Sequence, residues 1–498
     1  MSAADSTHHP VPVRKELYVP DPAAGRLIAA DLARLLSRPL GEVAVLGLGA
    51  SGVAAARLLT HIGFAVYASD RSVSDATRAA QHTLQSLGVV TDIGAHDLSR
   101  ITACAFVVVS PGIPPEAPPL AAARAAGVPV VSEVEVGLRL MPGLRIIAVT
   151  GTNGKTTTTA LIGHLLRALG HNAVDAGNIG VPVCDLTMRT PQPTWAALEL
   201  SSFQLHDTPG LRPDVGVLTT LSADHLDRYP SVDAYYADKA RLFANADQTS
   251  RWVVSADSTE IAQMMRGVAG TVTHFSVAQA VTQPDAQGWY DRARDALIID
   301  GEMFMPRADI ALLGDHNVAN VLAAVMAVMR ADPAHATPHA RQALANAVRL
   351  FHALAHRLEP VAERNGVTWI NDSKATNVAS TLVALEGMVR PTVLLLGGRH
   401  KGEAYTALAT PLVRRGKAVL CFGEAGEQAA RELREALPES GMVEWLRDAT
   451  FADVMSRARS LAQPGDVVLL SPACSSFDMF ANYVERGQRF AQLARGDV

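Results

Sequence analysis

Lysine is scarce in this chain. Its 498 residues include six lysines against thirty-eight arginines, so arginine carries most of the positive charge. Four of the six lysines (Lys155, Lys239, Lys374 and Lys401) nevertheless lie in segments that otherwise look most like catalytic machinery. A lysine kept in such a composition indicates a need for a compact point charge, or for an amine that can lose its proton. Chance placement is the competing explanation.

Cysteine is scarce as well, and no hydrophobic run is long. The cysteines are far apart and lack paired metal-ligand spacing, which indicates reduced, structural thiols at Cys104, Cys184, Cys421 and Cys474. No apolar run approaches the roughly 18 residues of a membrane span, and the polar segment 1–22 lacks the apolar stretch of a signal peptide. These absences predict a cytoplasmic protein that does not insert into membranes.

An excess of positive charge is also missing. The formal net charge of −5 at pH 7 argues against nucleic acid as a partner. With 48% hydrophobic residues, a chain of this length is too long for one core and predicts about three domains.

Apolar runs typical of strands alternate with helical patterns, which predicts the α/β class with parallel sheets and crossover helices. The pattern restarts twice along the chain. We therefore expect an N-terminal extension at 1–40 and three domains at 41–140, 141–354 and 355–498. One amphipathic stretch in the extension predicts a packing helix, at Leu27, Ile28, Leu32, Leu35 and Leu36.

A glycine-rich turn joins an apolar strand pattern at 146–149 to a helical pattern that begins near Lys155. Such a turn lets backbone N–H groups converge on an anion at a helix start. Lys155 can reach terminal phosphates, and the hydroxyl of Thr156 or Thr157 can hold Mg²⁺. Val149 stands where the full phosphate-loop pattern has glycine. The segment predicts nucleotide-phosphate binding, with an ordinary strand–turn–helix as the alternative.

A second glycine-rich turn, Gly47–Gly52, follows the apolar run 43–46, and Asp70 ends the next apolar run about 20 residues later. The spacing fits a dinucleotide, but a nucleotide-sugar would satisfy it equally well. Residues 110–113 are expected at a neighbouring strand end, where open α/β sheets bind ligands. Two tight turns without a ligand remain the alternative.

Glu199 and His225 each follow an apolar strand pattern, at 195–198 and 215–220. Beside a phosphate loop, a carboxylate and a histidine at neighbouring strand ends predict Mg²⁺ ligands, although carboxylate oxygen suits Mg²⁺ better than imidazole. Taken singly, each residue fits a helix cap or a core hydrogen bond.

Together these segments resemble the Mur ligase family over about residues 41–498. Four stretches point to its glutamate-adding branch: 47–52, 110–113, 371–377 and 471–478. The other shared motifs are Thr150–Thr157, Gly177–Gly180, Glu199–Leu205, Asp224–Tyr229, His316–Asn320 and His356–Glu359.

The resemblance implies an ATP-dependent ligase that adds D-glutamate to UDP-N-acetylmuramoyl-L-alanine in peptidoglycan synthesis, through an acyl phosphate. It also implies a Rossmann-like UDP-binding domain, a central P-loop ATPase domain and a Rossmann-like C-terminal domain that binds the amino acid. ATP and two Mg²⁺ sites are the expected cofactors, and a monomer is the expected state.

Other glutamate-adding ligases, either specific for L-glutamate or similar to folylpolyglutamate synthase, are the nearest alternatives. An NAD-dependent oxidoreductase would leave Lys155, Glu199 and Lys239 unexplained. A non-catalytic nucleotide-binding module would lack a key group, and no lysine or carboxylate of the motifs is missing.

The resemblance also implies roles for individual residues. The expected catalytic residues are Lys155, Glu199, His225 and Lys239. Metal coordination is expected from Thr156, Glu199, His225 and Lys239, the last as a carbamate that arginine cannot form. Residues expected at ATP are Gly151, Thr152, Asn153, Gly154, Lys155, Thr156, Thr157, Asn317, Asn320, Arg357, Asp372 and Lys374. Residues expected at the incoming glutamate are Thr376, Lys401, Ser476, Phe477 and Tyr483. Residues expected at the UDP substrate are Ala50, Ser51, Asp70, Arg71, Gly112 and Asn178, and Ser201 and Gln204 are also expected to bind substrate.

The chain departs from the family pattern at two positions near these sites. Thr220 stands where asparagine is usual, which affects the expected surroundings of His225. His400 replaces an aspartate, so the charge beside the glutamate site is less negative than the family pattern implies.

Overall fold

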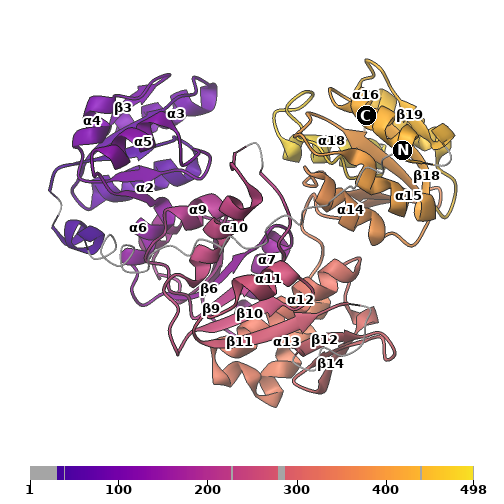
Figure 1. Ribbon diagram of the computed structural model, residues 1–498, viewed down its shortest axis with the longest axis horizontal. Coiled ribbons are helices and arrows are strands. Elements are labelled where there is room, and N and C mark those ends of the chain that lie inside the picture. Colours follow the sequence, from indigo (N-terminus) through magenta and orange to yellow (C-terminus); the bar gives the residue numbers. More distant parts are fainter. Residues whose placement is uncertain (1–30, 39, 226–227, 279–285, 438–439, 497–498) are drawn as a thin grey trace, which may run out of the picture.

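The structure, a computed structural model, describes residues 31–38, 40–225, 228–278, 286–437 and 440–496. Three α/β domains, each built on its own sheet, follow one another along the chain, and the central domain lies between the other two (Figure 1). The predicted α/β class with crossover helices is confirmed. No helix in the described part of the chain combines the length and apolarity that a bilayer crossing needs.

The N-terminal domain is a five-stranded parallel sheet in the order β3-β2-β1-β4-β5. Its strands are β1 (Glu42–Leu46), β2 (Ala65–Asp70), β3 (Val90–Ile93), β4 (Val107–Val109) and β5 (Val130–Ser132). Its helices are α2 (Ala50–His61), α3 (Asp75–Gln85), α4 (Leu98–Ala103), α5 (Pro118–Ala125) and α6 (Glu133–Arg139). The strand order reverses between β1 and β4, so the loops 47–52 and 110–113 meet at the switch point where such sheets bind ligands.

The described part of the N-terminal extension packs on this domain. Residues 31–37 are helical, and Leu32 and Leu36 are buried in the same cluster as Val43 and Leu58. The expected packing helix is confirmed over these residues, whereas Leu27 and Ile28 lie outside the described residues.

The central domain is a nine-stranded sheet in the order β14-β13-β12-β11-β10-β9-β6-β8-β7, parallel except around β13. Its strands are β6 (Arg145–Thr150), β7 (Ala173–Gly177), β8 (Trp195–Glu199), β9 (Val215–Leu218), β10 (Arg251–Ser255), β11 (Thr271–Ser276), β12 (Ala286–Asp291), β13 (Ala296–Ile299) and β14 (Glu302–Pro306). Its helices are α7 (Lys155–Ala168), α8 (Val183–Thr187), α9 (Ser202–His206), α10 (Val232–Ala240), α11 (Thr259–Met264), α12 (Asp315–Ala331) and α13 (Pro338–Leu350). The strand and helix predicted around the phosphate loop are β6 and α7.

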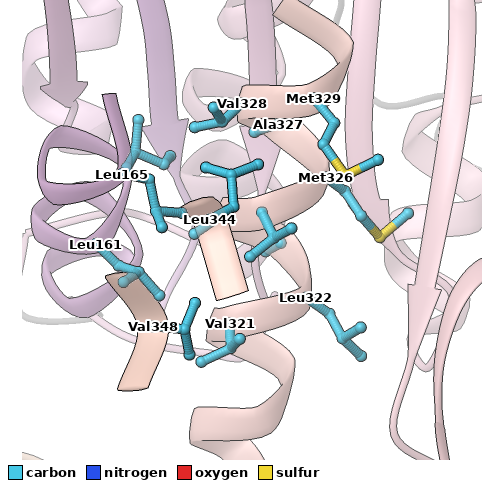
Figure 2. Close-up of a cluster of buried hydrophobic side chains, with 14 of the residues drawn as sticks. Leu161, Leu165, Val321, Leu322, Met326, Ala327, Val328, Met329, Leu344 and Val348 are labelled. Carbon is cyan, nitrogen blue, oxygen red and sulfur yellow. The ribbon is translucent and has the colours of Figure 1, made fainter. Parts of the chain in front are cut away.

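Helix α12 is apolar nearly all round because it runs between the sheet and two other helices. Its side chains meet Leu161 and Leu165 of α7 and Leu344 and Val348 of α13 in one buried cluster (Figure 2). This packing fixes α7, and with it the start of that helix at the phosphate loop.

The C-terminal domain has a six-stranded sheet in the order β15-β16-β20-β17-β18-β19, with only β15 antiparallel. Its strands are β15 (Glu359–Arg364), β16 (Val367–Asn371), β17 (Thr392–Gly397), β18 (Gly416–Phe422), β19 (Val443–Trp445) and β20 (Val467–Leu470). Its helices are α14 (Val378–Glu386), α15 (Ala409–Arg415), α16 (Gly426–Ala436), α17 (Phe451–Leu461) and α18 (Tyr483–Arg495). Because β16, β20 and β17 are parallel neighbours, the loops 371–377, 471–478 and 397–401 leave the same edge of the sheet.

Candidate active site

The phosphate loop between β6 and α7 depends on two glycines. Gly151 and Gly154 have φ of 145° and 84°, and a Cβ at Gly154 would collide with Asn320 Oδ1. Gly154 also opens α7 without a side-chain cap, which leaves helix N–H groups for an anion. Thr220 Oγ1 accepts a hydrogen bond of 2.8 Å from Asn153 N, so this unusual threonine supports the loop backbone directly.

Two lysines donate to the same carbonyl of this loop. Lys155 Nζ lies 3.0 Å from Gly151 O and 2.8 Å from Thr152 O, and Lys239 Nζ lies 2.7 Å from Gly151 O. Lys239 is only 1% exposed, and its amine lies 4.5 Å from the centre of the Tyr235 ring. Burial, and then the charge of Lys155, holds the pKa of Lys239 well below its usual value. A neutral amine is the form that can react with carbon dioxide to give a carbamate.

Glu199 ends β8, in register with Val149 of the neighbouring β6. Its Oε1 accepts a hydrogen bond of 2.8 Å from Asn178 Nδ2, and the carboxylate is 1% exposed. Its Oε2 has no hydrogen-bond partner among the residues that the structure describes. A buried carboxylate oxygen without a donor fits a bound cation.

His225 follows β9 with a left-handed backbone of φ 56°. Its ring lies 5.4 Å from the Phe203 ring and 5.9 Å from the Tyr235 ring, and burial lowers its pKa. The imidazole therefore favours the neutral form, which is the form that binds metals. Within the predicted motif Asp224–Tyr229, residues 226–227 lie outside the described residues.

Three hydrogen bonds join the C-terminal domain to the central domain, two of them at the phosphate loop and the start of α7, and we call this set of contacts the seam. Arg357 Nη2 donates to Thr156 Oγ1 at 2.6 Å, and Ser380 Oγ donates to Asn153 Oδ1 at 3.1 Å. Asn377 Nδ2 donates to Asp224 Oδ2 at 3.2 Å. Residues far apart in the sequence thus meet at the start of α7.

A pocket that is partly open to solvent lies along the seam, and its empty space, including the solvent at its mouth, is about 620 Å³. Its lining includes the predicted ATP residues Asn153, Gly154, Thr157, Asn317, Asn320, Arg357, Asp372 and Lys374. Asn320 is oriented by two hydrogen bonds, because Thr158 Oγ1 donates to its Oδ1 at 3.3 Å and its Nδ2 donates to Asn317 Oδ1 at 3.0 Å. Polar groups from two domains and apolar side chains thus line one cavity.

Asp372 and Lys374 enter this pocket from the loop after β16. Asp372 accepts hydrogen bonds from Ser471 Oγ at 2.8 Å and Leu358 N at 3.2 Å, yet burial raises its pKa to about 7. Burial, followed by the charge of Arg357, lowers the pKa of Lys374 to about 8. A bound anion beside Lys374 would favour its charged form further.

The residues predicted for the incoming amino acid lie at one edge of the C-terminal sheet. Lys401 Nζ donates to Thr376 Oγ1 at 3.2 Å. Ser476 is buried, whereas Phe477 is 61% exposed. Tyr483 opens α18, and its ring lies 5.3 Å from Lys374 Nζ.

The residues predicted for the UDP substrate are divided between two domains. Asp70 accepts a hydrogen bond of 2.8 Å from Leu48 N and so shapes the glycine turn ahead of Ala50 and Ser51, while Arg71 is exposed. Gly112 O accepts a hydrogen bond of 3.2 Å from Arg228 Nη1 of the central domain.

Asn178, Ser201 and Gln204 belong to the central domain. Asn178 orients Glu199, a contact that the sequence did not predict. Ser201 and Gln204 form a capping box at α9, and Gln204 Nε2 has no partner in the described part of the chain. A buried amide donor without an acceptor fits a polar ligand group.

Comparisons with known proteins cover all three domains. Three family models match: "Mur ligase MurD-like, N-terminal domain" at 41–132, "Mur ligase middle domain" at 149–328 and "Mur ligase, glutamate ligase domain" at 356–474. A UDP-N-acetylmuramoylalanine–D-glutamate ligase of Acidobacterium capsulatum is 38% identical over 91% of this chain and 95% of the relative. The chain belongs to the Mur ligase family. The ligase of the same name from Anaeromyxobacter dehalogenans is 39% identical to this Mur ligase over 91% of the chain and 97% of the relative.

Solved structures share the fold at low sequence identity. A pseudomurein peptide ligase type C from Methanothermus fervidus has a TM-score of 0.56 and 17% identity, over 91% of this chain and 100% of its own. A murein peptide ligase from Psychrobacter arcticus has a TM-score of 0.51 and 17% identity, over 92% of this chain and 99% of its own. These two likenesses support the Mur ligase fold of the chain.

The candidate metal ligands of this Mur ligase would form a complete site only with a change at Lys239. In the described part of the chain, no three side chains of His, Cys, Asp or Glu converge as metal ligands. Glu199 and His225 supply a free carboxylate oxygen and a neutral imidazole, and a carbamate on Lys239 would add a second acidic group beside the phosphate loop. The donor set then fits Mg²⁺, which prefers oxygen ligands.

Sequence reasoning missed several residues that shape the pocket. His316 and Leu354 line it, although His316 stands in a motif that the sequence singled out. Ser380 was missed because a serine in the first turn of a helix is common, and only the approach of Asn153 gives it a partner in another domain.

Proposed function

We propose that this Mur ligase joins D-glutamate to UDP-N-acetylmuramoyl-L-alanine, with ATP converted to ADP and phosphate through an acyl phosphate. Its relatives of 36–39% identity carry the name UDP-N-acetylmuramoylalanine–D-glutamate ligase. The observation that carries the proposal is the meeting of Lys155, Lys239 and Thr156 of the central domain with Arg357 of the C-terminal domain at one phosphate loop.

Each domain has one part of this task. Residues 41–140 bind the uridine nucleotide at the β1/β4 switch point, residues 141–354 bind the ATP phosphates, and residues 355–498 bind the amino acid and close over the nucleotide. The protein acts as a monomer in the cytoplasm, where ATP and the nucleotide-sugar are available.

The chemistry requires three ligands in line and exclusion of water from a hydrolysable intermediate. Lys155 leaves its two carbonyl partners for the terminal phosphate, and Arg357 leaves Thr156 Oγ1 for the same negative charge. Neutralising the phosphates in this way lets the acceptor carboxylate approach the γ-phosphorus. The γ-phosphoryl group passes to this carboxylate and ADP leaves. The amine of glutamate then attacks the acyl carbon from the side of Lys401 and Thr376, and the amide forms as the nitrogen loses a proton and phosphate leaves.

Thr156, Glu199, His225 and a carbamylated Lys239 would hold Mg²⁺ at two sites. Bound Mg²⁺ supplies additional positive charge to the phosphate oxygens. The free Oε2 of Glu199 and the lowered pKa of Lys239 support this assignment.

The deciding experiment is phosphate release from ATP with UDP-N-acetylmuramoyl-L-alanine and a panel of amino acids. Release that depends on both the UDP substrate and D-glutamate is the expected result. Equal release with L-glutamate would indicate a different stereospecificity, and release that ignores the UDP substrate would overturn the proposal.

A further inference from the structure

A series of hydrogen-bonded side chains, which we call the polar chain, lies beside the loop that carries Lys401. His400 Nδ1 lies 2.9 Å from Tyr405 Oη, and Tyr405 Oη lies 3.0 Å from Cys474 Sγ. On the other side of the ring, His400 Nε2 lies 3.4 Å from Gln428 Nε2 of α16. The side chain of His400 thus connects its loop to α16 and to the loop after β20.

The direction of these hydrogen bonds is set at the Gln428 end. Gln428 Nε2 donates to Glu432 Oε1 at 2.8 Å, which assigns the atom facing His400 as nitrogen. His400 Nε2 therefore accepts, and His400 Nδ1 donates to Tyr405 Oη, which in turn donates to Cys474 Sγ. Burial raises the pKa of Tyr405, and raises that of Cys474 to about 11, so both groups keep their hydrogens.

The backbone on both sides of His400 is conformationally permissive, so the side chain of His400 can help to fix it. Gly398 and Gly402 have φ of 135° and 88°, so the segment between them starts and ends at permissive residues. Arg399 is held by two backbone hydrogen bonds with Ser475, of 2.8 and 3.1 Å. The next anchor along the chain is the side chain of His400, directly before Lys401.

The residues that connect His400 to the domain interior are buried. Tyr405 is 1% exposed, and its backbone N donates to Glu432 Oε2 at 2.8 Å. Cys474 is fully buried. An aspartate at position 400, the residue usual in the family pattern, could only accept from Tyr405 and would reverse the chain of donors.

We propose that His400 is a positioning residue that, through Tyr405 and Cys474, holds Lys401 where it receives a carboxylate of the incoming amino acid. The inference rests on the proposed function, since that amino acid is D-glutamate. His400 acts on the affinity for the amino acid and leaves the ATP and UDP-substrate sites unchanged.

The test is steady-state phosphate release by the full chain, with D-glutamate, ATP and the UDP substrate varied in turn. Tyr405→Phe removes one hydroxyl from the middle of the polar chain and should raise KM for D-glutamate about fivefold to tenfold, the size of one lost hydrogen bond. The kcat and the other two KM values should change less than about twofold.

Variants at His400 extend the test. His400→Ala should raise KM for D-glutamate as much as Tyr405→Phe does. The double variant should have a KM no higher than that of the single variant with the higher KM, because both substitutions remove the same connection. His400→Asn should recover most of the affinity, since its amide nitrogen occupies the place of the ring Nδ1.

Tyr67→Phe is the matched control. The Tyr67 hydroxyl is also buried and hydrogen-bonded, 2.9 Å from Asp92 Oδ2 and 2.8 Å from Asp97 N, but it lies in the N-terminal domain. This variant should lose thermal stability and keep its KM for D-glutamate.

Two outcomes would overturn the role of His400: an unchanged KM for D-glutamate in Tyr405→Phe, or an equal rise in all three KM values. If the parent enzyme releases no phosphate with D-glutamate, the proposed function itself fails. If the parent is active and the variants keep its KM, only the positioning role fails.

Discussion

At the scale of single residues, Gly151 O shows how the chain uses its few lysines. Lys155 and Lys239 both donate to this carbonyl, and burial, followed by the charge of Lys155, lowers the pKa of Lys239. Placing two ammonium groups here would cost free energy, so the arrangement favours a neutral Lys239. Arginine, which keeps its charge, could not replace it.

Lys239→Arg should therefore reduce phosphate release at least about 100-fold while the protein remains folded, because a guanidinium cannot form a carbamate. Lys417→Arg is the control, since Lys417 pairs with Asp466 in the C-terminal sheet, away from the phosphate loop. Turnover near that of the parent in Lys239→Arg, at unchanged thermal stability, would refute the role of a carbamate.

Asp372 gives stability a pH dependence. Its pKa is about 7 in the folded protein against an ordinary 3.8, so between these values the folded state keeps a proton that the unfolded state has released. Stability from this group is complete below pH 3.8 and is lost as the pH rises to about 7. The slope is at most about 1.4 kcal/mol per pH unit.

Asp372→Asn should remove this slope. Urea unfolding between pH 4 and pH 7 should give a flatter curve for the variant than for the parent. Parallel curves for the two proteins would show that Asp372 does not titrate in this range.

At the scale of elements, α12 is the helix that packs the sheet of the central domain against α7 and α13. Leu322 and Met326 project from it toward β12 of the sheet, on the side away from α7 and α13, and are buried (Figure 2). Truncating Leu322→Ala should lower the free energy of unfolding by about 2–5 kcal/mol through lost contacts and a cavity. Leu350→Ala at the end of α13, where the leucine is 71% exposed, should change it by less than about 0.5 kcal/mol. Similar losses in both variants would contradict the packing described for α12.

The elements around the phosphate loop were predictable from sequence because their causes are local. Glycines that permit positive φ, an apolar strand before them and an apolar helical pattern after them indicate β6, the turn and α7. Glu199 at a strand end was predictable for the same reason. That Asn178 would orient Glu199 depended on β7 pairing with β8, which no local pattern encodes.

Contacts between segments far apart in the sequence were harder to predict, whether they join two domains or lie within one. Arg357 and Thr156 are 201 positions apart, and their hydrogen bond exists only because two separate sheets pack at the seam. The polar chain from Gln428 to Cys474 likewise joins a helix and two loops of the C-terminal sheet. The resemblance to Mur ligases indicated Arg357, whereas nothing in the sequence indicated the partners of His400.

At the scale of the whole molecule, the pocket proposed to bind ATP is complete only where two domains meet. Ser380→Ala would remove one contact of the seam, the hydrogen bond to Asn153. We expect a threefold to tenfold rise in KM for ATP, on the order of one hydrogen bond, with KM for the UDP substrate unchanged.

Ser460→Ala is the control for this change, because Ser460 is exposed on α17 and, among the described residues, hydrogen-bonds only with Arg457 of the same helix. An ATP dependence in Ser380→Ala identical to that of the parent would show that the seam does not contribute to nucleotide binding.

The pocket along the seam has one more consequence. Asn317 and Asn320 of the central domain line one side of it, and Asp372 and Lys374 of the C-terminal domain line the other. Any compound that fills the pocket therefore contacts both domains. Such a compound should make the two domains unfold in one cooperative transition, which calorimetry would record without an inhibition assay.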